Sequence, residues 1–283
     1  MRSVVMAALL LLATAAGADA QTDAAASFVV VQRGQMPVIL SAPHGGPDRM
    51  PGVADRVRPD PSAGSTARWG GFHGGAGDVG TLELTQLVAA RVKAKTGRAP
   101  YVVLNRAQRR YVDINRPANL AYDPPGTDGP KQIYDAYHRS LAEFCREVAE
   151  LYGRGLLLDI HGQGDARDTL FRGTSNGRTV RHLLHKDGPA ALTGPDSIFG
   201  ILAAKGYDVN PAIGSPAQED RRYNSGYIVV TYGGAAGSTV DAIQLEFGTN
   251  LRAKAGRAQS AEDLADAIVR FAAKYLPKEP AGR

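Results

Sequence analysis

Hydrophobic residues recur with two different periods along the chain, and these periods predict helices and strands in alternation. Four stretches repeat apolar positions three or four residues apart, which indicates amphipathic helices: residues 80–96, 130–152, 195–206 and 261–275. Residues 155–160 form a nearly continuous apolar run, which is typical of a strand buried on both faces.

Shorter stretches rich in β-branched and aromatic residues predict strands or extended segments: residues 28–32, 38–41, 101–104, 111–114, 226–232 and 242–247. Strands that alternate with helices predict an α/β fold, a single domain with a mixed, mostly parallel sheet flanked by helices. Residues 45–77 are rich in Gly, Pro, Asp and Ser, so we expect a long irregular segment there. Long loops in compact domains commonly carry function.

The first twenty residues have the three-part pattern of a secretory signal peptide. Arg2 lies in a short basic start, residues 4–16 are apolar, and small residues at 18–20 precede Gln21. The apolar part is shorter than the about 20 residues that span a membrane. We therefore expect cleavage after Ala20 and a periplasmic or secreted protein with no stable membrane span. The alternative is a retained N-terminal anchor.

Composition restricts the class of protein. The chain has 283 residues, 43% of them hydrophobic and 22% charged, which describes a globular protein. A single cysteine, Cys145, excludes an internal disulfide. The net charge of +5 is spread along the chain, so we expect no nucleic-acid partner. We predict a flexible leader at 21–27, one domain at 28–277 and a short tail at 278–283.

Three predicted strands end in side chains that bind metals or protons. His44 follows the strand at 38–41, His161 follows the buried strand at 155–160, and Glu246 lies near the end of a late strand. Ligands of open α/β sheets gather outside the carboxyl ends of the strands. Two histidines and a carboxylate there describe a catalytic zinc site. The alternatives are hydrogen-bonded turn histidines and a Glu246 that pairs with a buried arginine.

Four short motifs occur in a characteristic order: Ser-Ala-Pro-His-Gly-Gly at 41–46, Arg-Arg-Tyr-Val-Asp-Ile-Asn-Arg at 109–116, Asp-Ile-His-Gly at 159–162 and Gln-Leu-Glu-Phe at 244–247. Together they resemble the N-formylglutamate amidohydrolase family, a branch of the zinc-carboxypeptidase-like hydrolases. The resemblance extends over roughly residues 37–250 and implies that family's fold for the domain. One departure is Gly162, where the family has serine.

The resemblance implies a zinc site with three protein ligands. His44 matches the first ligand histidine and His161 the second. Asp78, in Gly-Asp-Val-Gly-Thr at 77–81, matches the position of the carboxylate ligand. Glu83 is the alternative ligand, and its own alternative role is that of an acidic residue near a helix N-terminus.

The family pattern also implies roles for three residues around the metal. Glu246 matches the acid that takes a proton from water and passes it to the leaving nitrogen. Asp159 is expected to hold the tautomer of a ligand histidine, although it could instead cap a helix. His138 lies on the predicted helix at 130–152, where we expect a structural role or support behind the ligands.

Substrate binding is assigned to a second group of residues. Asn115 and Arg116 resemble the pair that grips a substrate carboxylate, and an arginine suits this role because its planar fork donates two parallel bonds. Arg109 or Arg110 would add a cation or polarise the carbonyl oxygen. The alternative for both arginines is an ion pair with Asp113.

These assignments predict an exported zinc-dependent amidohydrolase. Its substrate would be an N-acyl amino acid or a peptide-like molecule with a carboxylate, and Zn²⁺ would be its cofactor. The nearest alternative enzyme is a periplasmic peptidoglycan or poly-γ-glutamate amidase. The alternative from another class is a non-catalytic protein that binds anionic ligands, although a pure binder has no need for a general base.

Overall fold

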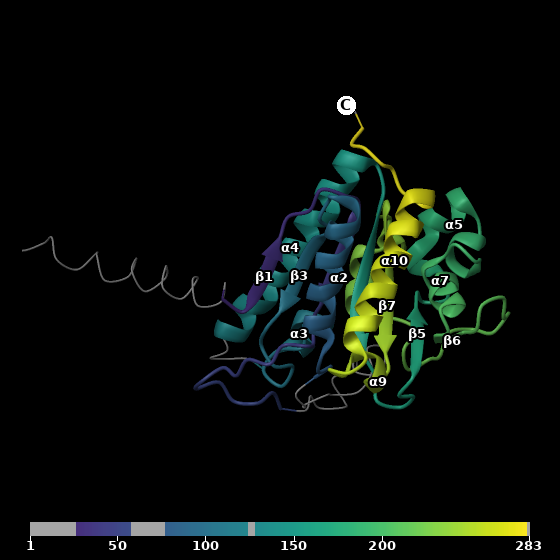
Figure 1. Ribbon diagram of the computed structural model, residues 1–283. Helices are drawn as coiled ribbons and strands as arrows, with labels where there is room; N and C mark the ends of the chain where they lie inside the picture. Colours follow the sequence, from purple (N-terminus) through teal and green to yellow (C-terminus); the bar gives the residue numbers. More distant parts are fainter. Residues whose placement is uncertain (1–26, 58–76, 124–127, 282–283) are drawn as a thin grey trace, which may run out of the picture.

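The protein is built on one seven-stranded sheet with the strand order β1-β3-β2-β4-β7-β5-β6 (Figure 1). The computed structural model describes residues 27–57, 77–123 and 128–281. The strands are β1 (Val29–Gln32), β2 (Val38–Ala42), β3 (Tyr101–Asn105), β4 (Gly155–Gly162), β5 (Thr169–Gly173), β6 (Asp208–Asn210) and β7 (Val240–Phe247).

The four central strands β3, β2, β4 and β7 run parallel to one another. Strands β1 and β5 are antiparallel to their neighbours β3 and β7, and β6 is parallel to β5. The predicted single α/β domain with a mixed, mostly parallel sheet is therefore confirmed.

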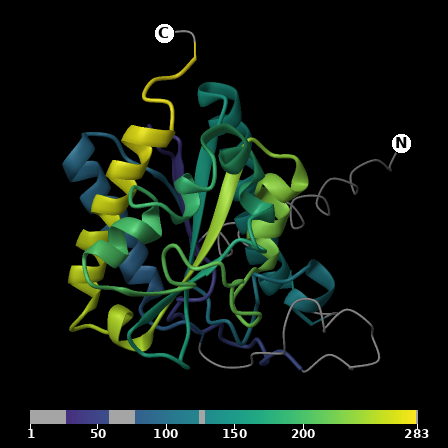
Figure 2. The ribbon, with the colours of Figure 1, turned by 90° about the vertical axis from the view of Figure 1, so that its right-hand side faces the viewer.

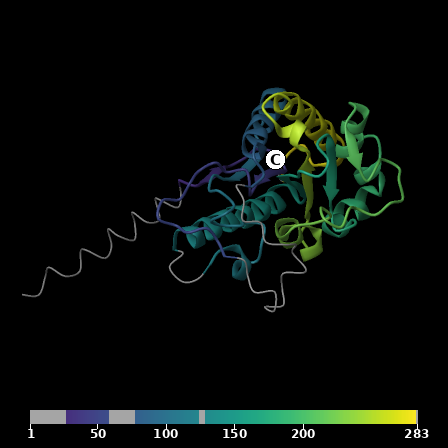
Figure 3. The same cartoon turned by 90° about the horizontal axis from the view of Figure 1, so that it is seen from below.

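Helices cover both faces of the sheet (Figures 2 and 3). One face carries α2 (Thr81–Thr96), α7 (Ile198–Ala204) and α10 (Arg257–Tyr275), and the other carries α4 (Asp128–Tyr152) and α8 (Tyr227–Tyr232). Short helices lie in the connections: α3 (Ala118–Ala121), α5 (Arg181–Asp187), α6 (Ala190–Thr193) and α9 (Thr249–Arg252), with 3₁₀ turns η2 (Arg178–Val180) and η3 (Gly234–Ala236). Within the described residues, no helix is both long and apolar enough to cross a membrane.

The central strands are buried on both faces, as the apolar run at 155–160 predicts. Successive side chains of a strand point to opposite faces. In β4, Leu156 and Leu158 pack towards α2 and α10, whereas Leu157 packs towards α4. Further along that second face come the polar residues Asp159 and His161. The face that packs on α4 therefore changes from apolar to polar at the carboxyl end of the strand.

The predicted strand at 226–232 is wrong, because the structure has the helix α8 there. Its β-branched run favours a strand, but tertiary contacts decide otherwise. Ile228 and Val229 are buried against the α4 layer. The backbone N–H of Ile228 donates to Oδ1 of Asn115 at 2.8 Å, which holds the first turn of the helix.

The extended segment predicted at 111–114 is also wrong. The segment begins with a turn, in which the Tyr111 N–H donates to the Gln108 carbonyl. Further along, the Asp113 carboxylate accepts the N–H of Asn115, two residues later. Both interactions bend the backbone.

Residues 45–57 lie outside helices and multi-residue strands, as expected for the irregular segment, whereas its residues 58–76 lie outside the described residues. The same holds for residues 1–26, which contain the predicted signal peptide and nearly all of the predicted leader, and for residues 282–283 of the predicted tail.

Candidate metal centre

The two candidate ligand histidines lie at the carboxyl ends of neighbouring parallel strands. His44 comes two residues after β2, and His161 is the penultimate residue of β4, which pairs with β2. In the sheet, β3 lies on one side of β2, and β4, the next strand along the chain, lies on the other side of β2 and is followed by β7. This is the point where the strand order reverses, and such a point opens a crevice at the carboxyl ends of the strands.

Asp78 joins the two histidines from the loop before α2. Its Oδ2 lies 3.3 Å from Nδ1 of His44 and 3.2 Å from Nδ1 of His161. The ligand atoms of all three residues lie within 4.8 Å of one another, and all three side chains are buried. Gly77 makes this approach possible, because a β-carbon there would lie 2.2 Å from the carbonyl oxygen of His44.

These separations fit a metal ion. Two atoms about 2.0–2.1 Å from one tetrahedral zinc ion lie about 3.3 Å apart, which matches both histidine–Asp78 distances. The far nitrogens are held as well: Nε2 of His44 lies 2.7 Å from Asp113 Oδ1, and Nε2 of His161 lies 2.8 Å from Asp159 Oδ2. A metal-binding histidine commonly donates its other N–H to a carboxylate. The three residues can therefore hold a metal ion through Nδ1, Nδ1 and a carboxylate oxygen.

The charges around the ligands already favour a cation. Burial alone would lower the pKa of His161, but Asp159, Asp78 and Glu246 raise it well above its ordinary value of 6.5. Burial alone would raise the pKa of Asp78, but His44, His161 and Arg109 hold it well below the ordinary value of 3.8. The site therefore stabilises positive charge between carboxylates, and a metal ion would replace the proton on Nδ1.

Gly162 supplies another contact to this centre. Its backbone N–H donates to Oδ2 of Asp78 at 3.0 Å. A β-carbon at this position would lie 2.3 Å from Nε of Arg252, which is itself bonded to the Phe247 carbonyl. Arg252 therefore takes up the space that the serine of the resembled family would need.

Glu246 lies beside the candidate metal centre, on the wall of a cavity of about 300 Å³ that His44, Asp78 and His161 also line. It is the register partner of His161 in the β4–β7 pair. Burial raises the pKa of Glu246 to about 7. In the described part of the chain it forms no ion pair, and Nε2 of Gln244 donates to its Oε1 at 2.9 Å. The expected alternative, a pairing with a buried arginine, is therefore not observed.

Arginines surround the carboxylate that holds His44. Oδ2 of Asp113 lies 2.9 Å from Nε of Arg109, and Arg56 and Arg116 approach it at 3.6 and 3.9 Å. Burial opposes ionisation of Asp113, but Arg109, His44 and Arg116 keep its pKa well below the ordinary value. The ion pair considered for Arg109 is thus present. Because Arg109 also lines the cavity, both readings of this residue fit the structure.

Asn115 and Arg116 line the same cavity, and the segment that carries them is held from behind. The hydroxyl of Tyr134 donates to the carbonyl of Arg116 at 3.0 Å. Nε2 of His138 lies 3.0 Å from the carbonyl of Ile114, and burial lowers the pKa of His138 to about 4, so its ring is neutral. His138 therefore contacts the backbone of this segment and not the cavity.

Two candidates lie away from the centre. Nη1 of Arg110 is 3.5 Å from Asp55 at the surface, and Arg110 is not among the residues that line the cavity, so its substrate contact stays a prediction. Of the two adjacent arginines, only Arg109 faces the site. Glu83 is half exposed and its carboxylate lies 3.3 Å from Nη1 of Arg257. The cluster of possible metal ligands in the described residues contains Asp78 and not Glu83.

Sequence reasoning missed several residues that line the cavity: Gln163, Asp165, Arg222, Tyr223, Ser225 and Gln244. All except Gln244 belong to loops with no periodicity or recognisable motif. Arg56, which braces Asp113, lies in the irregular segment at 45–57. Gln244 belongs to the Gln-Leu-Glu-Phe motif at 244–247. It lies two residues before Glu246, and this spacing places both side chains on the same face of one strand, which could have indicated that Gln244 also lines the cavity.

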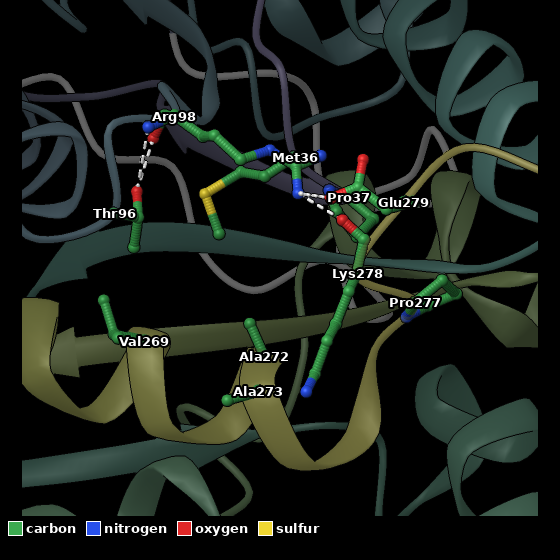
Figure 4. A pocket seen from close by; sticks show the side chains of 10 residues that line it. All are labelled: Met36, Pro37, Thr96, Arg98, Val269, Ala272, Ala273, Pro277, Lys278 and Glu279. Carbon is green, nitrogen blue, oxygen red and sulfur yellow. Dashed lines mark hydrogen bonds and ion pairs between the residues drawn. The ribbon is translucent and has the colours of Figure 1, made fainter. Parts of the chain in front are cut away.

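A separate hollow of about 310 Å³ lies at the other end of the sheet, where β2 begins and α2 and α10 end (Figure 4). Met36, Pro37, Val269 and Ala272 make much of its lining apolar. None of the three possible metal ligands lines it, so it is distinct from the candidate site.

Comparison with known structures identifies the fold. The N-formylglutamate amidohydrolase from Ralstonia eutropha superposes with a TM-score of 0.56 at 16% identity, over 88% of this chain and 98% of that one. The chain has the fold of N-formylglutamate amidohydrolase. A gene product from Agrobacterium tumefaciens superposes with a TM-score of 0.52 at 14% identity, over 87% of this chain and 95% of that one. No family model and no curated protein matches the sequence.

Proposed function

We propose that this protein is an exported zinc-dependent amidohydrolase. Its substrate would be an N-acyl amino acid or a peptide-like molecule that carries a carboxylate. The observation that carries the proposal is the convergence of His44, Asp78 and His161, whose ligand atoms lie within 4.8 Å of one another and whose two histidine–Asp78 distances suit one tetrahedral ion. The export part rests on the signal-like pattern of residues 1–20.

The chain's own residues supply the proton transfers. Bound zinc lowers the pKa of a water to about 7 and polarises an amide carbonyl. Glu246, whose burial raises its pKa to about 7, takes the proton of the attacking water and returns it to the leaving nitrogen. Asp159 and Asp113 hold the far nitrogens of His161 and His44, and so keep Nδ1 of each ring directed at the centre.

Arginines on the cavity wall select an anionic substrate. Arg109, Arg116 and Arg222 all line it. We assign the substrate carboxylate to Arg116 together with Asn115. Arg109 lies 3.7 Å from Oδ1 of Asp78 and is assigned to the carbonyl oxygen of the scissile amide. A cation beside the carbonyl oxygen stabilises the negative charge that develops there more strongly in a protein site of low dielectric than in water.

The test is hydrolysis by the purified protein after its metal has been removed and after zinc has been restored. N-formyl and N-acetyl derivatives of glutamate, aspartate and alanine form the first substrate panel. We expect zinc-dependent release of the free amino acid, and we expect His161→Ala to lose both zinc and activity. Tight binding of these acids without hydrolysis would instead support the non-catalytic alternative, and a His161→Ala protein with a full equivalent of zinc would refute the ligand assignment.

A further inference from the structure

A second hollow adjoins the metal cavity. Its volume is about 380 Å³, and Ser225 lines both spaces. Of the two residues before Ser225, Tyr223 lines the metal cavity and Asn224 lines the second hollow. The segment 223–225 is therefore a wall shared by the two spaces. We call the second space the Arg178 hollow, after the cation in its lining.

The lining of the Arg178 hollow suits a polar, anionic group. Ser175, Asn176, Asn224 and Ser225 offer hydroxyl and amide groups, and Arg178 offers a guanidinium. The lining contains no carboxylate. In the described part of the chain, no acidic side chain forms an ion pair with Arg178, which is exposed. A guanidinium in that position can bind an incoming carboxylate with two parallel hydrogen bonds.

The loop that forms one side of the Arg178 hollow is held in an uncommon conformation. Ser175 and Asn176 have φ values of 50° and 54°, in the left-handed region that costs energy for residues other than glycine. The N–H of Ser175 donates to the carbonyl of Asn224 at 2.6 Å, which ties this loop to the shared wall. Such conformations persist only where the surrounding structure imposes them.

The group that holds this loop in its conformation is the carboxylate of Glu219, which is buried at 3% exposure. Its Oε2 accepts the backbone N–H groups of Thr174 and Asn176, both at 2.8 Å. Its Oε1 accepts the Thr174 hydroxyl at 2.6 Å and lies 2.9 Å from Nε of Arg172. Arg172 balances the charge of Glu219, so this network shapes the loop and leaves Arg178 available to a ligand.

We propose that the Arg178 hollow is an extension of the substrate-binding site. It would take a carboxylate-bearing part of a substrate that is longer than a single N-acyl amino acid, while the first carboxylate is held in the metal cavity. The substrate class is then a peptide-like chain with at least two acidic groups. This assignment rests on the proposed function for its link to catalysis, but not for the binding itself.

The experiment measures binding of γ-linked glutamate oligomers of one to four residues by isothermal titration calorimetry. The zinc-loaded Glu246→Gln protein is used so that binding is measured without hydrolysis, and the metal-free wild type serves if that variant does not fold. We expect one of the longer oligomers to bind about two- to fivefold more tightly than the single residue, because Arg178 is exposed and an exposed charge pair contributes about that factor. In the Arg178→Ala background this preference for length should disappear.

Two controls sharpen the comparison. Arg181 is an exposed arginine three residues further along, outside the hollow, and Arg181→Ala should keep the preference. Converting the distal carboxylate of the oligomer to an amide should remove the preference in the parent protein. Equal affinity for all lengths, or a preference that survives in Arg178→Ala, overturns the proposal. If the length preference is present but the wild type hydrolyses none of the oligomers or N-acyl amino acids, the hydrolase proposal fails and the binding site stands.

Discussion

Removing the hydroxyl of Ser41 should weaken zinc binding although Ser41 touches no ligand atom. Ser41 is fully buried, and its Oγ donates to Oδ1 of Asp159 at 2.5 Å. Oδ2 of the same carboxylate holds Nε2 of His161 at 2.8 Å. The register of β2 and β4 places Ser41 directly opposite Asp159. Ser41 is therefore the group that fixes the carboxylate which in turn orients a ligand histidine.

The magnitude follows from the charge on Asp159. A hydrogen bond to a charged group contributes about 1.5–3 kcal/mol, and each 1.4 kcal/mol corresponds to about a factor of ten in affinity. If that loss is felt at His161, the zinc affinity of Ser41→Ala falls by about 10–100-fold, the range known for groups that support metal ligands. The matched control is Ser260→Ala, because Ser260 is also buried but lies on α10.

Competition with a chromogenic zinc chelator measures the affinity, and urea unfolding of the metal-free proteins measures stability. We expect Ser41→Ala to lose both, and Ser260→Ala to keep the wild-type zinc affinity whatever its stability. A Ser41→Ala protein that is destabilised but binds zinc within twofold of the wild type would show that Ser41 only fills space, and would refute the reasoning.

Three further predictions concern other positions. Arg116→Lys should raise KM for free-acid substrates, because a point charge cannot reproduce a planar fork. The wild type should hydrolyse amidated substrates as poorly as the variant hydrolyses the free acids. Equal wild-type rates on acid and amide would show that Arg116 does not bind the substrate carboxylate. Gln244→Leu removes the donor to Glu246 and should lower kcat about tenfold with zinc content little changed; a fully active variant contradicts this. Burial raises the pKa of Asp241 from 3.8 to about 7, so the folded state holds a proton that the unfolded state releases, and stability falls as pH rises from about 4 to 7. Asp241→Asn should flatten this fall and be more stable than the wild type at pH 8, by at most about 4 kcal/mol in urea unfolding; equal pH slopes would contradict it.

The sequence predicted the central part of the fold because strong patterns form it. The apolar run at 155–160 and the helical periodicity at 80–96 correspond to β4 and α2. Strands β5 and β6 were not predicted, because they are short and carry polar residues such as Arg172 and Asn210. The helix α8 was mistaken for a strand because its β-branched residues favour extended structure, whereas contacts with Asn115 and the α4 layer decide its conformation.

In the candidate site, the residues at strand ends could be predicted from the sequence pattern, whereas those on loops could not. His44, His161 and Glu246 could be expected to meet because each ends a strand, and strand ends converge in this class of sheet. The position of Asp78 depends on a loop conformation at Gly77, and that of Arg56 depends on an irregular segment, so local pattern says nothing about either. Gln163 and Arg222 likewise reach the cavity from loops. Loops supply much of the cavity lining, and their conformation follows from tertiary contacts that one sequence does not display.

The most direct test of the central claim is the turnover of Glu246→Gln, measured together with its zinc content and its melting temperature. Gln keeps the size and hydrogen-bonding capacity of Glu246 but cannot accept a proton. Because burial already disfavours the charge on Glu246, the neutral variant should fold with wild-type stability and hold one zinc ion per chain. Its turnover should fall by about 10²–10⁴-fold, the range for one acid–base group. A stable, zinc-loaded Glu246→Gln protein with near-normal turnover would contradict the proposed mechanism.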